Sequence, residues 1–423
     1  MFLSMPEPVP GAPASIAADA PSTTRPLPLF GAPAAGARDA RPGLSGLLPN
    51  QLIDWHAARG QPAYRARQLA DHLWSGRAVS FEEIHTLPAA LRTALTDSFR
   101  LDTLAETTSR PADAGLTEKA LHRLDDGRAI ESVLMRYPAR GPRRERATVC
   151  ISSQAGCAVG CPFCATGELG FWRDLDAAEI VDQVRFWRRR LAEEGRRVTN
   201  VVFMGMGEPF LNVDGVLEAA SALSDPLRFG LGARHITIST SGVVPGIERL
   251  IAARPQYTLA VSLHAARPAL RDLLVPLNRR WPATEVVAAA AAYAATTGRR
   301  VTYEIVMIDG VNDTAEDAHA VASLLEGQLA HVNLIPMNPV AHTPWLPSRP
   351  ERVEAYAAIL GESGLRTTIR RNRGIEIGAA CGQLAAELAG APTPEQVARR
   401  QRRLVDRSAA ALATNGAVPP GLA

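Results

Sequence analysis

Lysine is almost missing from this chain of 423 residues. Of its 46 lysine and arginine residues, only Lys119 is a lysine, and the formal net charge is only +3. So small a surplus of positive charge does not by itself indicate a nucleic-acid partner. Arginines cluster within residues 140–146, 370–373 and 399–403, which would suit phosphate contacts, but a solvated surface explains such clusters equally well.

Long apolar runs are also missing. No stretch reaches the roughly 18 apolar residues that a membrane-spanning helix needs. The first residues, Met1 to Pro6, lack a basic segment followed by an apolar one, so we expect no secretion signal. The hydrophobic fraction of 46% is ample for a packed core. We therefore expect a cytoplasmic protein with one large catalytic domain, a smaller accessory domain and tails.

Cysteine is scarce, with five residues in all. A chain this large builds its own core and needs no disulfide framework. Three of the five are spaced Cys-x3-Cys-x2-Cys, at Cys157, Cys161 and Cys164. An iron–sulfur cluster held by only three cysteines leaves one iron open for a ligand. Zinc with a histidine as fourth ligand is the alternative, although structural zinc sites usually show a different spacing.

The core of the chain alternates short β-branched runs with segments of helical periodicity from Thr148 onward. Such alternation favours parallel strands joined by right-handed crossovers. We therefore predict an α/β fold, a partial (β/α)6 barrel with its chemistry on loops at the carboxyl ends of the strands. The six predicted strands are Val149–Ser152, Asn200–Met204, His235–Thr240, Thr258–Leu263, Val301–Met307 and His331–Ile335.

The remaining segments differ in composition. The first 43 residues are rich in Pro and Ala and predict a disordered tail. Helical periodicity then predicts a small accessory domain, with Phe81–Thr86 as one of its helices. Two β runs flanking Asp126-Gly127 predict a hairpin. We divide the chain into a tail (1–43), a helical domain (44–103), a small β region with a basic loop (104–145), the barrel (146–390) and a basic C-terminal tail beginning as a helix (391–423).

Polar motifs follow several predicted strands, where a barrel places its site. The turn Met204–Pro209 contains glycines that allow close backbone approach and Glu208, which can accept hydrogen bonds from an ammonium group. Ser239–Gly242, Ser262–His264 and Ile335–Asn338 end three further strands. Each motif alone is equally explained as a turn or a cap.

Two cysteines lie outside the triple motif. Cys150 is in or just after the first barrel strand, and Cys381 is in a loop of small residues, Gly378–Gln383. They are either inert buried thiols or a nucleophile with its resolving thiol. Their spacing in the sequence does not place them together.

Taken in order, these motifs resemble a known family. The triple cysteine spacing is similar to that of radical S-adenosylmethionine (SAM) enzymes. Over about residues 46–390 the chain closely resembles the RlmN/Cfr family of radical SAM methylases of RNA adenosine. The resemblance rests on Arg146–Cys157, Met204–Pro209, Ile238–Pro245, Ser262–His264, Ile335–Pro339 and Cys381–Leu384.

The resemblance implies a role for each motif. The three clustered cysteines hold a [4Fe–4S] cluster whose open iron binds SAM. Cys381 carries a methyl group, Cys150 resolves the product, and Glu131 accepts a proton, although Glu131 is equally explained as a salt-bridge residue of the hairpin. The implied SAM contacts are Gly207, Glu208, Ser239, Ser262, Leu263, His264 and Asn338.

The resemblance also implies a route that uses two SAM molecules. The first methylates Cys381, and the second is cleaved to a radical that takes hydrogen from the S-methyl group. The carbon radical adds to adenine, and Cys150 then attacks the sulfur of Cys381, which releases methylated RNA and leaves a disulfide for an external reductant. This route fits adenine C2, which is not a nucleophile, because a covalent intermediate divides the hard step.

The resemblance suggests 23S rRNA at the peptidyl-transferase centre and adenosine 37 of some tRNAs as substrates, and a flavodoxin-like electron donor. We expect a monomer that does not bind membranes. Because lysine and arginine are not interchangeable at a tight site, we also expect Lys119 to contact RNA or a catalytic carboxylate. Three alternatives stay open: Cfr-type C8 methylation, a radical SAM enzyme without a methylcysteine, and a zinc-stabilised RNA-binding protein without catalysis.

Overall fold

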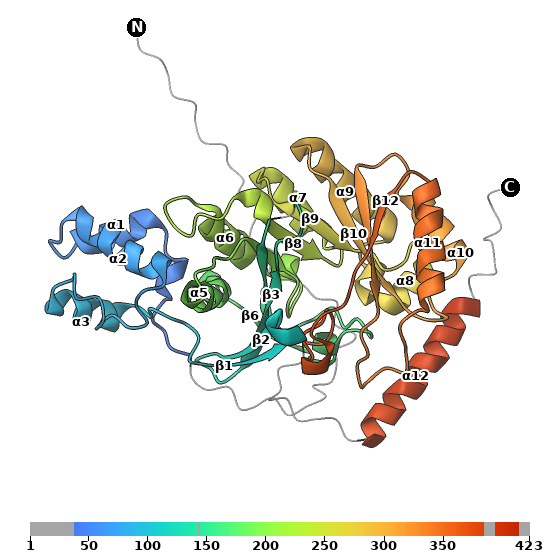
Figure 1. Ribbon diagram of the computed structural model, residues 1–423, viewed down its shortest axis with the longest axis horizontal. Helices are drawn as coiled ribbons and strands as arrows, with labels where there is room; N and C mark the ends of the chain where they lie inside the picture. Colours follow the sequence, from blue (N-terminus) through green and yellow to red (C-terminus); the bar gives the residue numbers. More distant parts are fainter. Residues whose placement is uncertain (1–37, 143, 385–393, 414–423) are drawn as a thin grey trace, which may run out of the picture.

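The computed structural model describes residues 38–142, 144–384 and 394–413 (Figure 1). Its centre is a ten-stranded sheet in the order β1-β2-β3-β4-β7-β8-β9-β10-β11-β12. The strands of this sheet are β1 (Glu106–Ala112), β2 (Thr117–Arg123), β3 (Ala129–Tyr137), β4 (Arg146–Cys150), β7 (Asn200–Phe203), β8 (Ile236–Thr240), β9 (Thr258–Ser262), β10 (Val301–Met307), β11 (Ala330–Pro336) and β12 (Arg366–Ile369).

The strands from β4 to β12 pair in parallel and form the predicted open barrel. All six predicted strands are present. A seventh, β12, follows α11 and extends the sheet beyond β11. The helices between strands are α5 (Ala177–Glu193), α6 (Val213–Ser224), α7 (Val244–Ala253), α8 (Pro268–Leu274), α9 (Ala283–Thr297), α10 (Ala315–Leu324) and α11 (Pro350–Glu362).

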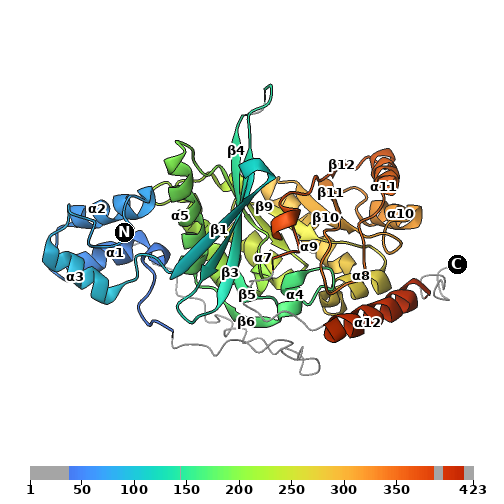
Figure 2. The ribbon, with the colours of Figure 1, turned by 60° about the horizontal axis from the view of Figure 1, so that its bottom comes forward.

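The predicted hairpin at Asp126-Gly127 joins β2 to β3. Together with β1, these strands pair antiparallel and continue the barrel sheet, because β3 also pairs with β4. The small β region therefore does not form a sheet of its own (Figure 2). A second sheet, β5 (Gln154–Gly156) with β6 (Phe171–Asp174), flanks the segment that contains the three clustered cysteines and α4 (Ala165–Leu169).

The accessory domain contains α1 (Pro49–Ala57), α2 (Ala63–Ser75) and α3 (Ala89–Ser98), which lie beside α5 at one end of the molecule (Figure 1). The predicted helix Phe81–Thr86 is wrong, because this segment forms consecutive turns. Phe81, Ile84 and Leu87 are buried at intervals of three, and each of these turns closes with a single backbone hydrogen bond. Six residues before Pro88 are too few to propagate a helix.

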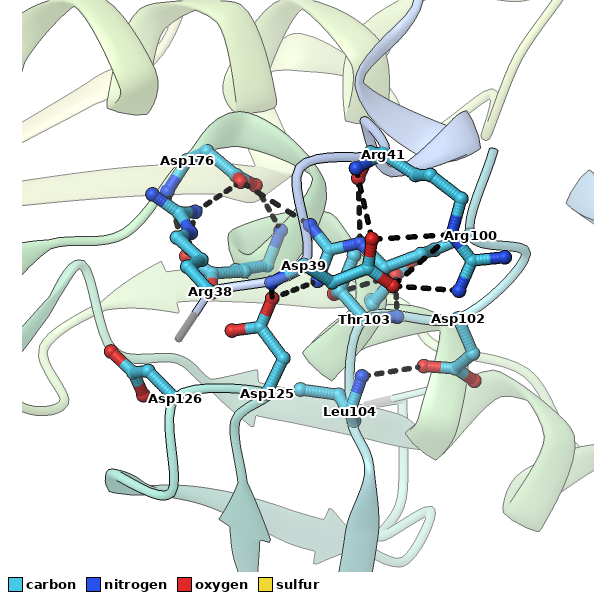
Figure 3. Close-up of polar contacts among 12 residues, drawn as sticks. Arg38, Asp39, Arg41, Arg100, Asp102, Thr103, Leu104, Asp125, Asp126 and Asp176 are labelled. Atoms are coloured by element: carbon cyan, nitrogen blue, oxygen red, sulfur yellow. Dashed lines mark hydrogen bonds and ion pairs between the residues drawn. The ribbon is translucent and has the colours of Figure 1, made fainter. Parts of the chain in front are cut away.

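The tail predicted for residues 1–43 lies mostly outside the described residues, but residues 38–43 follow a defined path between the helical domain and the sheet (Figure 3). Arg38 pairs with Asp176 at 2.6 Å, and the Asp39 backbone N–H donates to Asp125. Arg100 donates to the backbone oxygen of Arg41 and pairs with Asp125 at 2.8 Å. The predicted tail therefore extends too far, since charged contacts hold its last residues in place.

The C-terminal segment forms one long helix, α12 (Pro394–Ala413), which packs against α8 below the barrel (Figure 2). This agrees with the basic helix expected at the start of the C-terminal tail. Among the described helices, none is long and apolar enough to cross a membrane.

Candidate functional site

A cavity opens at the carboxyl ends of the parallel strands, as the barrel prediction requires. Its walls include the three clustered cysteines, the turn after β7, and the ends of β8, β9 and β11. The predicted site residues lining it are Cys157, Cys161, Cys164, Gly207, Glu208, Ser239, Ser262, His264, Asn338 and Cys381.

The three clustered thiols form one wall of this cavity. Burial raises the pKa of Cys157 to about 12 and also raises the pKa of Cys161 and Cys164. Metal ligation needs thiolates, so binding of a metal centre here must release their protons. Among the described residues, no three His, Cys, Asp or Glu side chains are placed to share one metal ion. Three thiols that line one cavity would instead suit a larger iron–sulfur cluster.

Glu208 is fixed in the cavity wall by the turn after β7. Its carboxylate accepts from the Ser241 N–H and hydroxyl, each at 2.7 Å, and from the Phe210 N–H at 3.1 Å. Burial raises the pKa of Glu208, and these hydrogen bonds oppose that effect. The φ of Gly207 is +101°, and a Cβ there would meet Gln154 at 2.6 Å, so only glycine fits this turn. An oriented carboxylate of this kind suits an ammonium group.

The end of β9 places His264 in the cavity wall. Its Nδ1 accepts from the Val306 N–H at 3.1 Å, so the neutral ring carries its proton on Nε2. Burial lowers the pKa of His264 to about 3, and the ring packs edge-on against Phe163. Leu263 is fully buried and does not line the cavity, and its backbone oxygen accepts from Arg271 at 3.1 Å.

Asn338 follows β11 and joins the cavity wall to the loop that contains Cys381. Its Nδ2 donates to the Cys381 backbone oxygen at 2.9 Å. Its Oδ1 is buried and has no hydrogen-bond partner among the described residues. A buried acceptor without a donor is costly, so this oxygen is suited to accept from a bound ligand.

Cys381 is exposed and also lines a second, smaller cavity, whose wall contains Cys150. The structure therefore brings together two cysteines that lie 231 positions apart in the sequence. Burial raises the pKa of Cys150 to about 12. Loss of hydration raises the pKa of Cys381 as well, and the positive charge of Arg370 opposes this shift. Arg370 lines both cavities.

Glu131 lies in β3 on the same face as Val133, the residue paired with Cys150 on β4. Its carboxylate is buried and forms an ion pair with Lys119 of β2, with Nζ and Oε1 2.9 Å apart. Neither side chain lines the larger cavity. The single lysine thus contacts the carboxylate that the family resemblance marks as catalytic. Lys119 also lies beside the Cys381 loop, 3.6 Å from the position of a Cβ on Gly378.

Two charged residues of the cavity wall, Glu304 and Arg370, were not identified from the sequence. Glu304 lies in the middle of β10, where its carboxylate accepts from Asn333 at 2.8 Å. Burial raises its pKa, and the charge of Arg370 opposes the shift. A glutamate inside the apolar run Val301–Met307 is unusual, and this signal could have identified Glu304 from the sequence. For Arg370, the sequence signal was only its place in the arginine cluster at residues 370–373.

Comparison with known proteins agrees with this geometry. Residues 151–322 match the model of the Radical SAM superfamily. The chain is 51% identical to a probable dual-specificity RNA methyltransferase RlmN from Parafrankia sp. (strain EAN1pec), over 78% of this chain and 87% of that one. A relative with the same description from Thermobifida fusca (strain YX) is 47% identical, over 81% and 94%. The crystal structure of a radical SAM methyltransferase from Sphaerobacter thermophilus is 46% identical, with a TM-score of 0.78, over 82% and 100%.

Fold and site thus define a radical SAM methyltransferase. With relatives this similar over most of both chains, the protein belongs to the RlmN family of RNA methyltransferases. The cofactors of such an enzyme are SAM and a [4Fe–4S] cluster. The site fits both, because three thiols face a cavity that also offers the Glu208 carboxylate and the unpaired Asn338 oxygen. A zinc-stabilised protein without catalysis is set aside.

Proposed function

We propose that this enzyme methylates C2 of adenosine, in 23S rRNA at the peptidyl-transferase centre and at adenosine 37 of tRNA. The observation that carries the proposal is the position of the cysteines: all five line two cavities that meet at Cys381. The description of the relatives as dual-specificity RNA methyltransferases supports two RNA substrates. An external flavodoxin-like reductant, a monomeric state and a cytoplasmic location complete the proposal.

Each part of the site then has a task. Cys157, Cys161 and Cys164 hold the cluster, and when bound the cluster and SAM supply the one-electron chemistry that activates a methyl group. The residues that bind SAM are Gly207, Glu208, Ser239, Ser262, Leu263, His264 and Asn338. Glu208 accepts from the methionine ammonium, and the free Oδ1 of Asn338 accepts from the adenosine part.

Cys381 and Cys150 carry the covalent steps. Cys381 takes a methyl group from a first SAM, and the radical chemistry that a second SAM would supply removes one hydrogen from this methyl group. The remaining carbon bonds to C2 of the adenine, and the adduct would return one electron to the cluster, so that a methylene group joins the Cys381 sulfur to the RNA. Glu131 accepts a proton. The Cys150 thiolate then attacks the Cys381 sulfur, and the bond from that sulfur to the methylene carbon breaks. The carbon keeps the electron pair and takes up a proton to become the methyl group, and the external donor reduces the resulting disulfide.

Two cysteine variants test the proposed roles of Cys381 as methyl carrier and Cys150 as resolving thiol. Cys381→Ala should abolish RNA methylation, and Cys150→Ala should accumulate a covalent protein–RNA adduct that a denaturing gel resolves. Both should keep the absorbance of the cluster near about 400 nm, since neither residue is among its three proposed ligands. Methylation by Cys381→Ala, or free unmodified RNA from Cys150→Ala, would refute the methylcysteine route.

A further inference from the structure

Helix α12 presents two different faces, and its inner face fixes it to the walls of the active site. Leu404 is 7% exposed and belongs to a group of buried apolar residues that also contains Trp345 and Val159. Val159 lies in the loop between Cys157 and Cys161. Arg400 pairs with Glu168 of α4 at 2.8 Å, and Gln401 donates to a backbone oxygen of the loop after β11. The helix is thereby anchored to two loops that also build the cavity.

The outer face of α12 is a stripe of arginines. Arg399, Arg403 and Arg407 follow one another at intervals of four residues, and Arg402 lies beside them. All four are exposed, and within the described part of the chain none forms an ion pair. We call these four residues the α12 arginine face. Glu395 and Asp406 are the acidic residues of the helix.

A neighbouring element adds to this positive charge. Arg279 lies at the end of the short 3-10 helix Pro276–Arg279, beside α8, on which α12 packs. Burial and the charge of Arg279 together lower the pKa of Arg407, so the two guanidinium groups are near one another. Four arginines of the face and Arg279 outnumber Glu395 and Asp406, and this surplus of positive charge favours an anionic partner.

We propose that the α12 arginine face binds backbone phosphates of the RNA substrate beside the cavity mouth. The choice of partner rests on the RNA methylation proposed above. A helix of 20 residues is about 30 Å long and spans several phosphates, and arginine pairs with phosphate in a bidentate manner. Glu168, the partner of Arg400, follows Thr166 and Gly167 of the cavity wall, so the helix that presents these arginines is joined to that wall.

An anionic membrane is the other partner that a basic amphipathic helix suggests, but it fits this helix less well. A helix on a membrane surface needs a free apolar face. In α12 that face is occupied, because Leu404 and Ser408 are buried against the barrel. Among the described residues of α12, Val405 and Leu412 are the large apolar side chains left exposed, which is little apolar surface to enter lipid.

The test compares two double charge reversals in the full, cluster-loaded enzyme. Arg402→Glu with Arg403→Glu alters the α12 arginine face. Arg300→Glu with Arg366→Glu is the matched control, since both arginines are exposed at the amino ends of β10 and β12, on the rim away from the site. Affinity for a tRNA transcript is measured by fluorescence anisotropy between about 50 and 300 mM KCl. SAM-dependent methylation of Cys381 without RNA reports on the intact site.

The proposal predicts that the α12 variant loses about tenfold or more in RNA affinity at about 100 mM salt, and that its salt slope falls by about 1 to 2. The control should stay within about twofold, and Cys381 methylation should be unchanged in both. The neutral pair Arg402→Gln and Arg403→Gln should give a smaller loss, which separates charge from misfolding.

Unchanged RNA affinity in the α12 variant, or an equal loss in the control, would overturn the proposal. So would unchanged RNA affinity combined with lost binding to vesicles of phosphatidylglycerol, which would assign the face to membranes. If the α12 variant loses RNA affinity but the wild-type enzyme yields no methylated adenosine, RNA binding by the α12 arginine face is supported and the proposed function is wrong. The experiment therefore distinguishes failure of the binding surface from failure of the proposed function.

Discussion

Cys381 is held by neighbours from three parts of the chain. Asn338 donates to its backbone oxygen, and the Ala165 N–H, next to the cluster cysteines, donates to the oxygen of Gly382 at 2.7 Å. Arg370 supplies a positive charge to the thiol. The φ of Gly382 is +83°, which leaves little choice but glycine after the reactive residue. Small changes in these neighbours should therefore alter the chemistry before they alter the fold.

Lys119 is the first such neighbour to test. Its ammonium pairs with Glu131 and lies beside Gly378, so the larger, planar guanidinium of Lys119→Arg should not fit the same space. We predict a fall of about tenfold in RNA methylation with unchanged cluster content, measured under single-turnover conditions. Full activity and full RNA affinity in this variant would show that the site does not require a lysine at position 119.

His122 makes stability depend on pH. Burial between β1 and β3 lowers its pKa to about 3, and its Nε2 lies 2.6 Å from the Ser132 hydroxyl. The unfolded value is about 6.5, so the unfolded chain takes up the proton first as the pH falls. This contribution to stability is complete above about pH 6.5 and is lost between about 6.5 and 3.

We therefore predict that lowering the pH from about 7.5 to 5.5 reduces the free energy of unfolding by about 1 kcal/mol through this residue. Urea titrations at both pH values measure it. His122→Asn should show a pH dependence weaker by that amount, and an identical dependence in both proteins would refute the assignment.

At the scale of elements, Leu404 is the buried apolar side chain that holds α12 in the group of residues that also contains Val159. Leu404→Ala removes this side chain from the group and should cost about 2 to 4 kcal/mol of helix docking. Faster hydrogen exchange along α12 and faster bleaching of the cluster in air would report it. Leu412→Ala on the same helix, at a residue 37% exposed, is the control and should change both by little. Equal effects would show that Leu404 does not anchor the helix.

The sequence predicts those elements whose burial follows a regular pattern. The six apolar barrel strands and the hairpin at Asp126-Gly127 were predictable for this reason. Strand β12 was not, because Arg366–Ile369 is a largely exposed edge with little apolar character. Phe81–Thr86 misled because buried residues at intervals of three occur in successive turns as well as in helices.

The site shows a similar division. Motifs at strand ends marked six residues of the larger cavity, because parallel strands bring their carboxyl ends together, and the cysteine spacing marked three more. The meeting of Cys150 and Cys381 depends on how the last loop folds back over the barrel, which local sequence does not encode. Arg370 belongs to the interior only through that same long-range packing.

At the scale of the whole molecule, the antiparallel strands support the loop that contains Cys381. Asp113, between β1 and β2, accepts from the Thr117 hydroxyl at 2.6 Å and from the Gly374 N–H at 2.9 Å. We predict that Asp113→Ala slows RNA methylation about tenfold while SAM binding is unchanged, because Cys381 loses its fixed position. Asp113→Asn keeps an acceptor and should restore most of the rate; equal rates in both variants would contradict this support role.

The central claim is that these five cysteines together methylate adenosine at C2. The most direct measurement is mass spectrometry of nucleosides from 23S rRNA and tRNA treated in vitro with the cluster-loaded enzyme, SAM and a reductant. The account predicts 2-methyladenosine from both RNAs, and none when Cys381 is replaced by alanine. The appearance of 8-methyladenosine instead, or of no methylated adenosine at all, would contradict it.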